Sequence, residues 1–214
     1  MAVINYTGSL TVKDPYRIIP VSRRYSAYKK ACDTTLTILL LPVALAGIAL
    51  GIVLTFLSSK GPVIFIQERV GLGGRVFRMY KIRTMVYKPG GYTAYTVPGD
   101  ERVTPVGRLL RKTKIDELPQ IINVLRGEMS LIGPRPERVE IANYFSAIDE
   151  NYAYRHCIKP GITGLAQVYC PLATPKENLV RLNFDLYYIT NFSLLLDVLI
   201  IIKTVVVICR MKGL

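Results

Sequence analysis

A run of 22 residues without a single charge, from Leu36 to Leu57, constrains this chain more than any other feature. A helix of about 20 apolar residues is long enough to cross the hydrocarbon core of a bilayer. The run begins too late and is too long for the apolar core of a signal peptide, and no good cleavage site follows it. We therefore expect a membrane segment that is retained in the protein.

Two features of this run bear on its topology. Pro42 lies within it, where a proline removes one helical hydrogen bond and favours a kink. Both flanks are also basic, with four Lys or Arg in residues 23–30 and six in residues 60–83. Because basic flanks are retained in the cytoplasm, a re-entrant helix that bends at Pro42 satisfies both of them. An ordinary span followed by a charged cytoplasmic domain satisfies only one, and the residues alone leave these two interpretations open.

The composition narrows the functional class. The chain has 214 residues, 28 Lys and Arg against 15 Asp and Glu, a formal charge of +13 and 50% hydrophobic residues. Nucleic-acid-binding proteins are often basic, but such a protein would be expected to have a basic helix with interleaved aromatic residues and no long apolar run. This chain has the apolar run, so no nucleic-acid partner is expected. A protein that contacts a membrane and handles anionic groups fits both the charge and the hydropathy.

The rest of the sequence predicts an α/β, helix-rich fold with a small β-hairpin and interfacial amphipathic helices. We divide it into an arm and basic flank (1–30), the re-entrant membrane helix (31–59) and a cytoplasmic-face catalytic domain (60–214). Apolar and glycine patterns predict a hairpin over 63–82, helices over 106–113, 117–126 and 137–157, a stiff loop at 130–136 and a turn at 160–161. The apolar segment 193–209 contains Asp197 and Lys203, which favours a buried or interfacial helix over a span.

The adjacent carboxylates Asp116 and Glu117 are the first candidates for chemistry. If a helix begins here, Asp116 suits the N-cap, and a capping Asp with a solvated Glu is the simplest interpretation. Arg111 and three further cations, at positions 108, 112 and 114, lie just upstream. A carboxylate among these cations would stay ionised and could approach a phosphate, while Glu117 could hold a divalent cation.

Two further basic motifs could bind anions. In Gly133-Pro134-Arg135-Pro136, two prolines restrict the backbone around one guanidinium, which limits the entropy lost when it binds an anion. Lys81 and Arg83 end the predicted hairpin, and beside a membrane segment they would ordinarily contact lipid headgroups. Each motif alone is also compatible with an ordinary surface loop or hairpin.

Taken together, these motifs resemble the bacterial sugar transferases, the monotopic polyprenol-phosphate phosphoglycosyl transferases. The resemblance runs over about residues 28–207 and rests on several motifs in a fixed order. These are Gly61–Gly71, Tyr80–Met85, Arg111–Gln120 with its Asp-Glu-Leu-Pro-Gln core, Ser130–Pro136, Pro160–Val168 and Asp185–Asp197. Its extent matches the minimal catalytic unit of that family.

The resemblance implies a reaction, a cofactor and a location. The family transfers a sugar-1-phosphate from a UDP-sugar to polyprenol phosphate, usually undecaprenyl phosphate, and releases UMP. This is the first membrane step in making a surface glycan such as an exopolysaccharide or lipopolysaccharide, or a glycoprotein. It requires Mg²⁺ and occurs on the cytoplasmic face of the bacterial inner membrane, where the enzyme also meets membrane lipids and can form a homodimer.

The resemblance also assigns residues. Asp116 would be the nucleophile, forming a covalent phosphosugar intermediate, and Glu117 would assist in metal or proton handling, with both carboxylates as metal ligands. The substrate phosphates would meet cations at five positions, namely Lys81, Arg83, Arg111, Arg135 and Arg138. Asp185 matches a further acid of the family without an assigned role, and Pro42 matches the proline that breaks the re-entrant helix.

The sequence departs from the family pattern at two places. Leu41 precedes Pro42 where relatives carry a serine, and Tyr169-Cys170-Pro171 stands where relatives often carry Asn-Gly-Arg. A non-catalytic membrane-anchored module that binds anionic lipid is the alternative function. It accounts for the charge and the apolar run but gives no reason for paired carboxylates among arginines.

Overall fold

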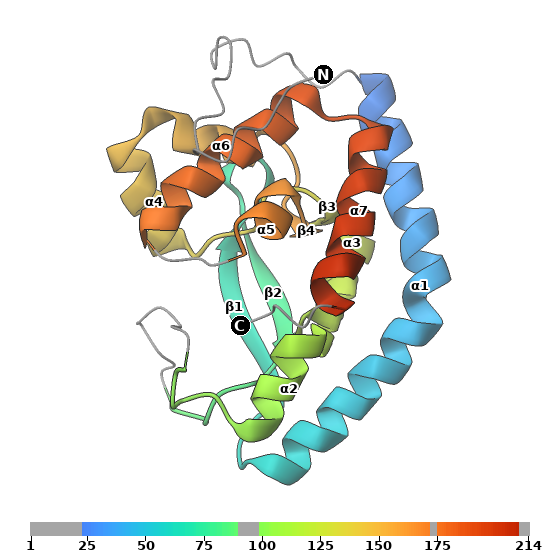
Figure 1. The fold of residues 1–214 in the computed structure, drawn as a ribbon, viewed down its shortest axis with the longest axis vertical. Coiled ribbons are helices and arrows are strands. Elements are labelled where there is room, and N and C mark those ends of the chain that lie inside the picture. The colour runs from blue at the N-terminus through green and yellow to red at the C-terminus, as the bar shows by residue number, and fades with distance from the viewer. Residues whose placement is uncertain (1–22, 90–98, 172–174, 210–214) are drawn as a thin grey trace.

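The computed structural model describes residues 23–89, 99–171 and 175–209. Residues 1–22 of the predicted arm and basic flank lie outside these ranges, as does the segment 90–98. The longest element is helix α1, Arg23–Ser58, whose 36 residues include Pro42. Figure 1 shows this helix bending near its middle while its backbone stays helical through the proline. In the described part of the chain it is the one helix long and apolar enough to cross a membrane. The predicted apolar helix is confirmed, whereas its re-entrant topology stays a prediction.

The inner face of α1 is lined by small residues. Ala44 and Thr55 are buried, and a Cβ added at Gly47 or Gly51 would lie 2.6 Å from Leu118 or 2.5 Å from Ile82. These four positions recur every three to four residues and therefore share one helical face. The small side chains let the domain approach α1 closely, and large apolar side chains such as Leu39 and Phe56 stay exposed on its other faces.

The predicted hairpin is confirmed. Strands β1, Ile64–Val70, and β2, Val76–Ile82, pair antiparallel, with Ile64 opposite Ile82 and Val70 opposite Val76. The short 3₁₀ turn η1, Leu72–Gly74, connects them, and Gly73 and Gly74 both have positive φ. Glycine adopts such a backbone without steric penalty, so these residues serve the turn.

Helix α2, Pro105–Thr113, confirms the helix predicted over 106–113, and the Thr104 hydroxyl caps it by accepting from the Gly107 N–H. The helix predicted over 117–126 is instead a 3₁₀ segment, η2 (Ile115–Gln120), followed by a short α3 (Ile121–Leu125). Pro119 lies within η2, where its missing N–H disfavours regular α-helical hydrogen bonding. Gly127, with φ of 76°, ends the segment as predicted.

Two segments predicted as a loop and a turn form a second, parallel sheet, so both predictions were wrong in part. Strand β3, Ser130–Ile132, pairs with β4, Gly161–Thr163, in the register Ser130 to Gly161 and Ile132 to Thr163. The chains approach so closely here that a Cβ on Gly161 would lie 2.1 Å from the Gly133 nitrogen. Glycines at this crossing therefore permit the pairing.

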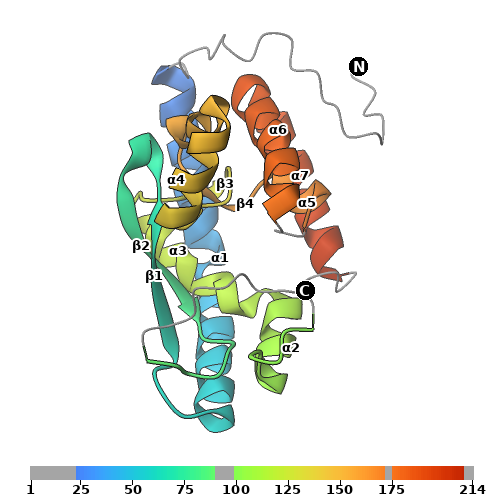
Figure 2. The same ribbon diagram turned by 90° about the vertical axis from the view of Figure 1, so that its left-hand side faces the viewer.

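Helices cover this small sheet. The predicted helix 137–157 is divided at Asp149 into α4, Val139–Ile148, and the 3₁₀ segment η3, Glu150–Cys157. After α5, Leu165–Tyr169, the chain ends in α6, Pro175–Asn191, and α7, Leu194–Cys209. Figure 2 shows α6 and α7 together on one side of the molecule and the hairpin on the other.

Among the described residues, the core forms three hydrophobic clusters beneath these elements. One joins α4, η3 and α6, one joins the parallel sheet to α5, α6 and α7, and one joins β2 to α3. Helix α7 buries Asp197 and Ile200 but exposes a row of large apolar side chains, namely Leu194, Leu195, Val198, Leu199, Ile202, Val205 and Val206. This mixture of a buried and an exposed apolar face agrees with the predicted helix over 193–209.

Candidate active site

Asp116 lies in the first turn of η2, where an unusual backbone conformation directs the chain. Lys114 has φ of 60°, the one positive φ of a non-glycine residue in the described ranges, and it separates α2 from η2. Asp116 is 7% exposed and lies inside η2, whose N-cap position is taken by Lys114. Its Oδ1 has no hydrogen-bond partner among the described residues. The predicted N-cap role of Asp116 is therefore wrong, and a carboxylate oxygen remains available.

The electrostatics of Asp116 are set by burial and by its neighbours. Burial and the adjacent Glu117 raise its pKa to about 6, while Lys81, Lys114 and Arg111 act in the opposite direction. The carboxyl is thus more basic than an ordinary aspartate but is still mostly ionised at neutral pH.

Glu117 is held by two cations from separate elements. Its Oε1 accepts from Lys81 Nζ of β2 at 2.7 Å and from Arg135 Nη2, after β3, at 2.9 Å. Burial alone would raise the pKa of Glu117, but Arg135 and Lys81 outweigh it and hold that pKa well below its usual range. Burial lowers the pKa of Lys81 to about 8 despite Glu117, and Glu117 raises the pKa of Arg135. Glu117 is therefore a fixed anion that positions two cations beside Asp116.

Arg111 joins the same site from α2. Its Nε donates to Thr84 Oγ1 at 2.8 Å, and burial lowers its pKa while Asp116 and Glu117 raise it. Asp116 raises the pKa of Arg111, and Arg111 lowers the pKa of Asp116, so each charge stabilises the other. Lys81, Arg111 and Arg135 thus gather around the two carboxylates, which brings three separate basic motifs of the sequence into one site. Their phosphate-binding role stays a prediction.

Arg83 and Arg138 have different surroundings. Arg83 donates from Nη1 and Nη2 to the carbonyls of Lys60 and Ser59, just beyond the end of α1, at 2.5 and 2.9 Å. These contacts connect the end of α1 to the hairpin and engage the guanidinium away from the carboxylates. Arg138 stands at the N-cap position of α4, and its charge acts on Arg69. The phosphate-binding role of these two residues stays a prediction.

A second, buried network supports Arg135. Arg155 donates from Nε to Asp185 at 2.7 Å, from Nη1 to the Tyr152 hydroxyl at 2.5 Å and from Nη2 to the Arg135 carbonyl at 3.2 Å. Asp185 on α6 therefore orients Arg155, which in turn holds the backbone of Arg135. This contact places Asp185, the acid whose role the resemblance left open, behind the Arg135 loop.

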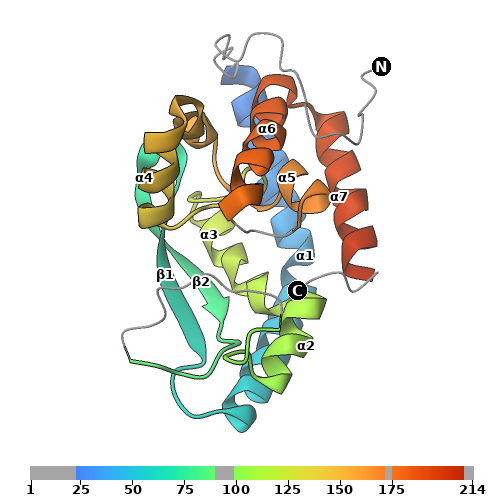
Figure 3. The ribbon, with the colours of Figure 1, turned by 60° about the vertical axis from the view of Figure 1, so that its left-hand side comes forward.

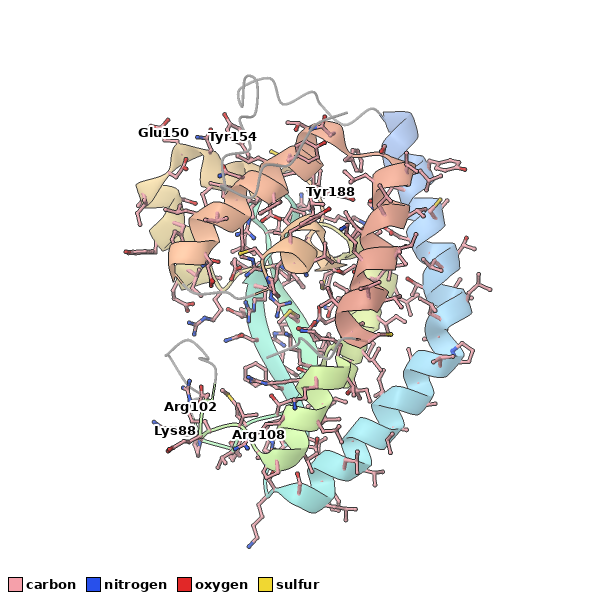
Figure 4. The ribbon with its side chains drawn as sticks, viewed as in Figure 1. Lys88, Arg102, Arg108, Glu150, Tyr154 and Tyr188 are labelled. Carbon is pink, nitrogen blue, oxygen red and sulfur yellow. The ribbon has the colours of Figure 1, made fainter. Side chains whose placement is uncertain are left out.

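Sequence reasoning missed several members of these networks, above all Arg155, Tyr152 and Thr84. Arg181 and Asp185 are charged residues four positions apart in a helix with an apolar face, a spacing that places both on one side. That pattern could have indicated a buried charge cluster. The other upstream cations, Arg108 and Lys112, are exposed. Figure 4 places Arg108 with Lys88 and Arg102 at the end of the molecule away from α4 and α6.

The carboxylates suit a magnesium ion only together with a substrate. Among the described residues no group of three or more His, Cys, Asp or Glu gathers to hold a metal by itself. Mg²⁺ is commonly bound by one or two carboxylates and completed by phosphate oxygens and water. The partnerless Oδ1 of Asp116, beside the Glu117 carboxylate, fits such a partial ligand set.

Comparison with known proteins decides the family. The sequence profile described as "Bacterial sugar transferase" matches residues 24–211, which is most of the chain. The chain belongs to the bacterial sugar transferase family. The matched region begins in α1 and includes both carboxylates and the three cations around them.

Individual relatives in this family carry informative names. The chain is 44% identical over 183 residues to the UDP-N-acetylgalactosamine-undecaprenyl-phosphate N-acetylgalactosaminephosphotransferase of Aeromonas hydrophila, covering 85% of this chain and 43% of the relative. It is 41% identical over 193 residues to the UDP-glucose:undecaprenyl-phosphate glucose-1-phosphate transferase of Escherichia coli K12, covering 87% and 41%. It is 40% identical over 177 residues to the uncharacterized sugar transferase EpsL of Bacillus subtilis, covering 83% and 85%. The chain thus spans about half or less of the length of the first two relatives and most of the third.

Proposed function

We propose that this chain transfers a sugar-1-phosphate from a UDP-sugar to polyprenol phosphate, producing a polyprenyl-diphosphate sugar and UMP. One observation carries the proposal: Asp116 is a buried, mostly ionised carboxylate with a partnerless oxygen, set among Lys81, Arg111 and Arg135. The printed activities of the Aeromonas and Escherichia relatives, which share this region, support the same reaction class.

In the first step, the Asp116 carboxylate attacks the phosphorus that bears the sugar. A new bond forms between an Asp116 oxygen and phosphorus, and the bond from phosphorus to the bridging oxygen of UMP breaks. UMP leaves with that electron pair, and the phosphosugar stays on the protein as an acyl phosphate. A pKa of about 6 makes Asp116 a stronger nucleophile than an ordinary aspartate while it remains ionised at pH 7.

In the second step, an oxygen of polyprenol phosphate attacks the same phosphorus and displaces the Asp116 carboxylate. Two displacements at one site mean that the two anionic substrates need not bind at the same time. Lys81, Arg111 and Arg135 reduce the repulsion between Asp116 and each incoming phosphate, and Glu117 keeps Lys81 and Arg135 in place through its 2.7 and 2.9 Å contacts.

Asp116 and Glu117 would also hold Mg²⁺ together with the substrate diphosphate. When bound, the ion would supply neutralisation of the phosphate charge. The other roles belong to protein side chains. The three cations bind the diphosphate, and the burial of Asp116 excludes water from the acyl phosphate.

The lipid substrate explains the exposed apolar surfaces. Apolar side chains on α1 and α7 would immerse the helices in the cytoplasmic leaflet of the bacterial inner membrane, where a polyprenol phosphate presents its headgroup. We accordingly place the reaction at the first membrane step of a surface-glycan or glycoprotein pathway.

The test is UMP release by the purified chain in lipid nanodiscs, with undecaprenyl phosphate, Mg²⁺ and a panel of UDP-sugars that includes UDP-glucose and UDP-N-acetylgalactosamine. At least one UDP-sugar should give UMP and a lipid-linked sugar, and Asp116→Asn should give neither. A folded wild-type chain that binds anionic vesicles but releases no UMP with any sugar would favour the lipid-binding alternative.

A further inference from the structure

Two buried arginines, Arg155 and Arg181, belong to the cluster behind Arg135, and only one has its hydrogen bonds made. Arg155 donates to Asp185, to Tyr152 and to the Arg135 carbonyl. Arg181 on α6 is 2% exposed and is among the largest fully buried side chains. Its Nε and Nη1 nonetheless have no hydrogen-bond partner in the described part of the chain.

The nearby acids are already engaged with other arginines. Asp185 is bonded to Arg155 at 2.7 Å, and the two carboxylate oxygens of Glu137 lie 3.9 Å from Arg155 and from Arg69. These four arginines, Arg69, Arg135, Arg155 and Arg181, still outnumber the three carboxylates among them, which are Glu117, Glu137 and Asp185. Burial lowers the pKa of Arg181 more than Glu137 and Asp185 raise it. Since a guanidinium keeps its charge in proteins, the cluster carries an excess of buried positive charge.

This excess lies beside the site of the proposed reaction. The charge of Arg135 acts on Arg181, and Arg135 itself is bonded to Glu117 at 2.9 Å. Figure 3 shows α6, which carries Arg181, lying between α4 and α7 with α5 next to it. A buried cation without a partner is unfavourable unless an anion completes its surroundings. The substrates of the proposed reaction bring such anions to the neighbouring carboxylates.

We propose that Arg181 binds a phosphate group of a substrate through the donors that lack a protein partner. The proposal rests on the proposed function for the source of that phosphate, which is either the nucleotide or the polyprenol phosphate. Arg155 would not compete for the phosphate, because Asp185, Tyr152 and the Arg135 carbonyl hold all three of its nitrogens. Arg181 is thus a binding residue, and Arg155 is a positioning residue.

The experiment replaces Arg181 with methionine in the full chain in nanodiscs. Arg181→Met removes a buried charge and keeps a long unbranched side chain, so the ligand-free protein should melt at the wild-type temperature or above it. Binding of a phosphate ligand should weaken about tenfold to a hundredfold, the loss expected for hydrogen bonds to a charged group. Arg78→Met, at an exposed position on β2, is the matched control and should change neither property.

Two ligands distinguish the source of the phosphate. Calorimetric titration with UMP reports the nucleotide phosphate, and titration with undecaprenyl phosphate in nanodiscs reports the lipid phosphate. Weakening of one titration alone assigns Arg181 to that substrate. Unchanged affinity for both ligands would overturn the proposal. If Arg181→Met does not fold, the Arg181→Lys variant, which keeps the charge, takes its place. Wild-type affinity of Arg181→Lys for both ligands would also overturn the proposal, because the planar fork of the guanidinium would then have no role in binding.

The outcome is separable from that of the proposed function. A wild-type chain that binds UMP through Arg181 but releases no UMP from any UDP-sugar would support the phosphate site and refute the proposed reaction. If the wild-type chain turns over and the Arg181→Met variant has the wild-type KM for both substrates, the phosphate site is refuted and the proposed reaction is supported.

Discussion

Replacing Asp116 with asparagine should abolish transfer and, at the same time, make the protein more stable. The side chain is buried, and its pKa is raised from 3.8 to about 6, first by burial and then by Glu117. The ionised form is therefore less stable in the folded protein than in the unfolded chain. Asparagine has nearly the same shape as the protonated acid and carries no charge to desolvate.

The magnitude follows from the shift. A change of about two pKa units corresponds to about 3 kcal/mol at a pH above both values. Leaving an amide group of the asparagine unpaired in place of the partnerless Oδ1 offsets about 1 kcal/mol of this. We expect Asp116→Asn to raise the free energy of unfolding by about 2 kcal/mol at pH 7.

The pH dependence of the free energy of unfolding tests the sign of this predicted effect. A raised carboxyl pKa contributes stability that is fully present below the unfolded value of 3.8 and is lost as pH rises through about 6. The stability advantage of Asp116→Asn should consequently be largest at pH 7 and above, fall as the pH drops, and turn into a loss of about 1 kcal/mol near pH 3, where only the unpaired amide remains. Reversible denaturant unfolding of both proteins in detergent, at several pH values, measures this. A variant that is less stable than wild type at pH 7, or an advantage that does not fall with pH, would refute the reasoning.

Four further predictions concern the carboxylate site and the membrane topology of α1. Glu117→Gln should destabilise the protein by about 3 kcal/mol in denaturant unfolding, because it leaves Lys81 and Arg135 buried without their anion. Arg111→Lys keeps the charge but loses the planar fork, so kcat should fall about tenfold or more, whereas Arg78→Lys should not change it. The rate of UMP release should fall about tenfold per pH unit below about 6, as Asp116 becomes protonated. Cysteines introduced at positions 26 and 90 should be equally protected from an impermeant reagent in intact cells, and reaction at only one of them would exclude re-entry.

The local sequence pattern predicted the elements that depend on neighbouring residues. The apolar run, the hairpin with its turn glycines and α2 follow from periodicity and turn chemistry, and all three are present. The pairing of β3 with β4 could not be predicted in this way. Each strand has three residues, too few for an alternating pattern, and the partners are about thirty positions apart. The Pro-Gly pair at 160–161 gave a turn signal at the very start of β4.

The candidate site was only partly predictable for a similar reason. The motifs named Asp116, Glu117, Lys81, Arg111 and Arg135, and the fold brings all five together. The conformation that places Asp116 depends on Lys114 at positive φ, which sequence propensity does not favour for lysine. For Arg83 the sequence motif predicted an anion-binding role. In the structure its guanidinium instead donates to backbone carbonyls at the end of α1. A guanidinium serves either partner, and only the tertiary arrangement decides between them.

The most direct measurement of the central claim is a quenched reaction without the lipid acceptor. The purified chain is mixed with Mg²⁺ and an accepted UDP-sugar that carries label in both the sugar and its attached phosphate, then quenched and digested. We predict release of up to one UMP per chain, label on the peptide that contains Asp116, and loss of that label when polyprenol phosphate is added before the quench. Asp116→Asn should carry no label. UMP release that depends strictly on polyprenol phosphate, with no labelled protein at any time, would contradict a covalent intermediate on Asp116.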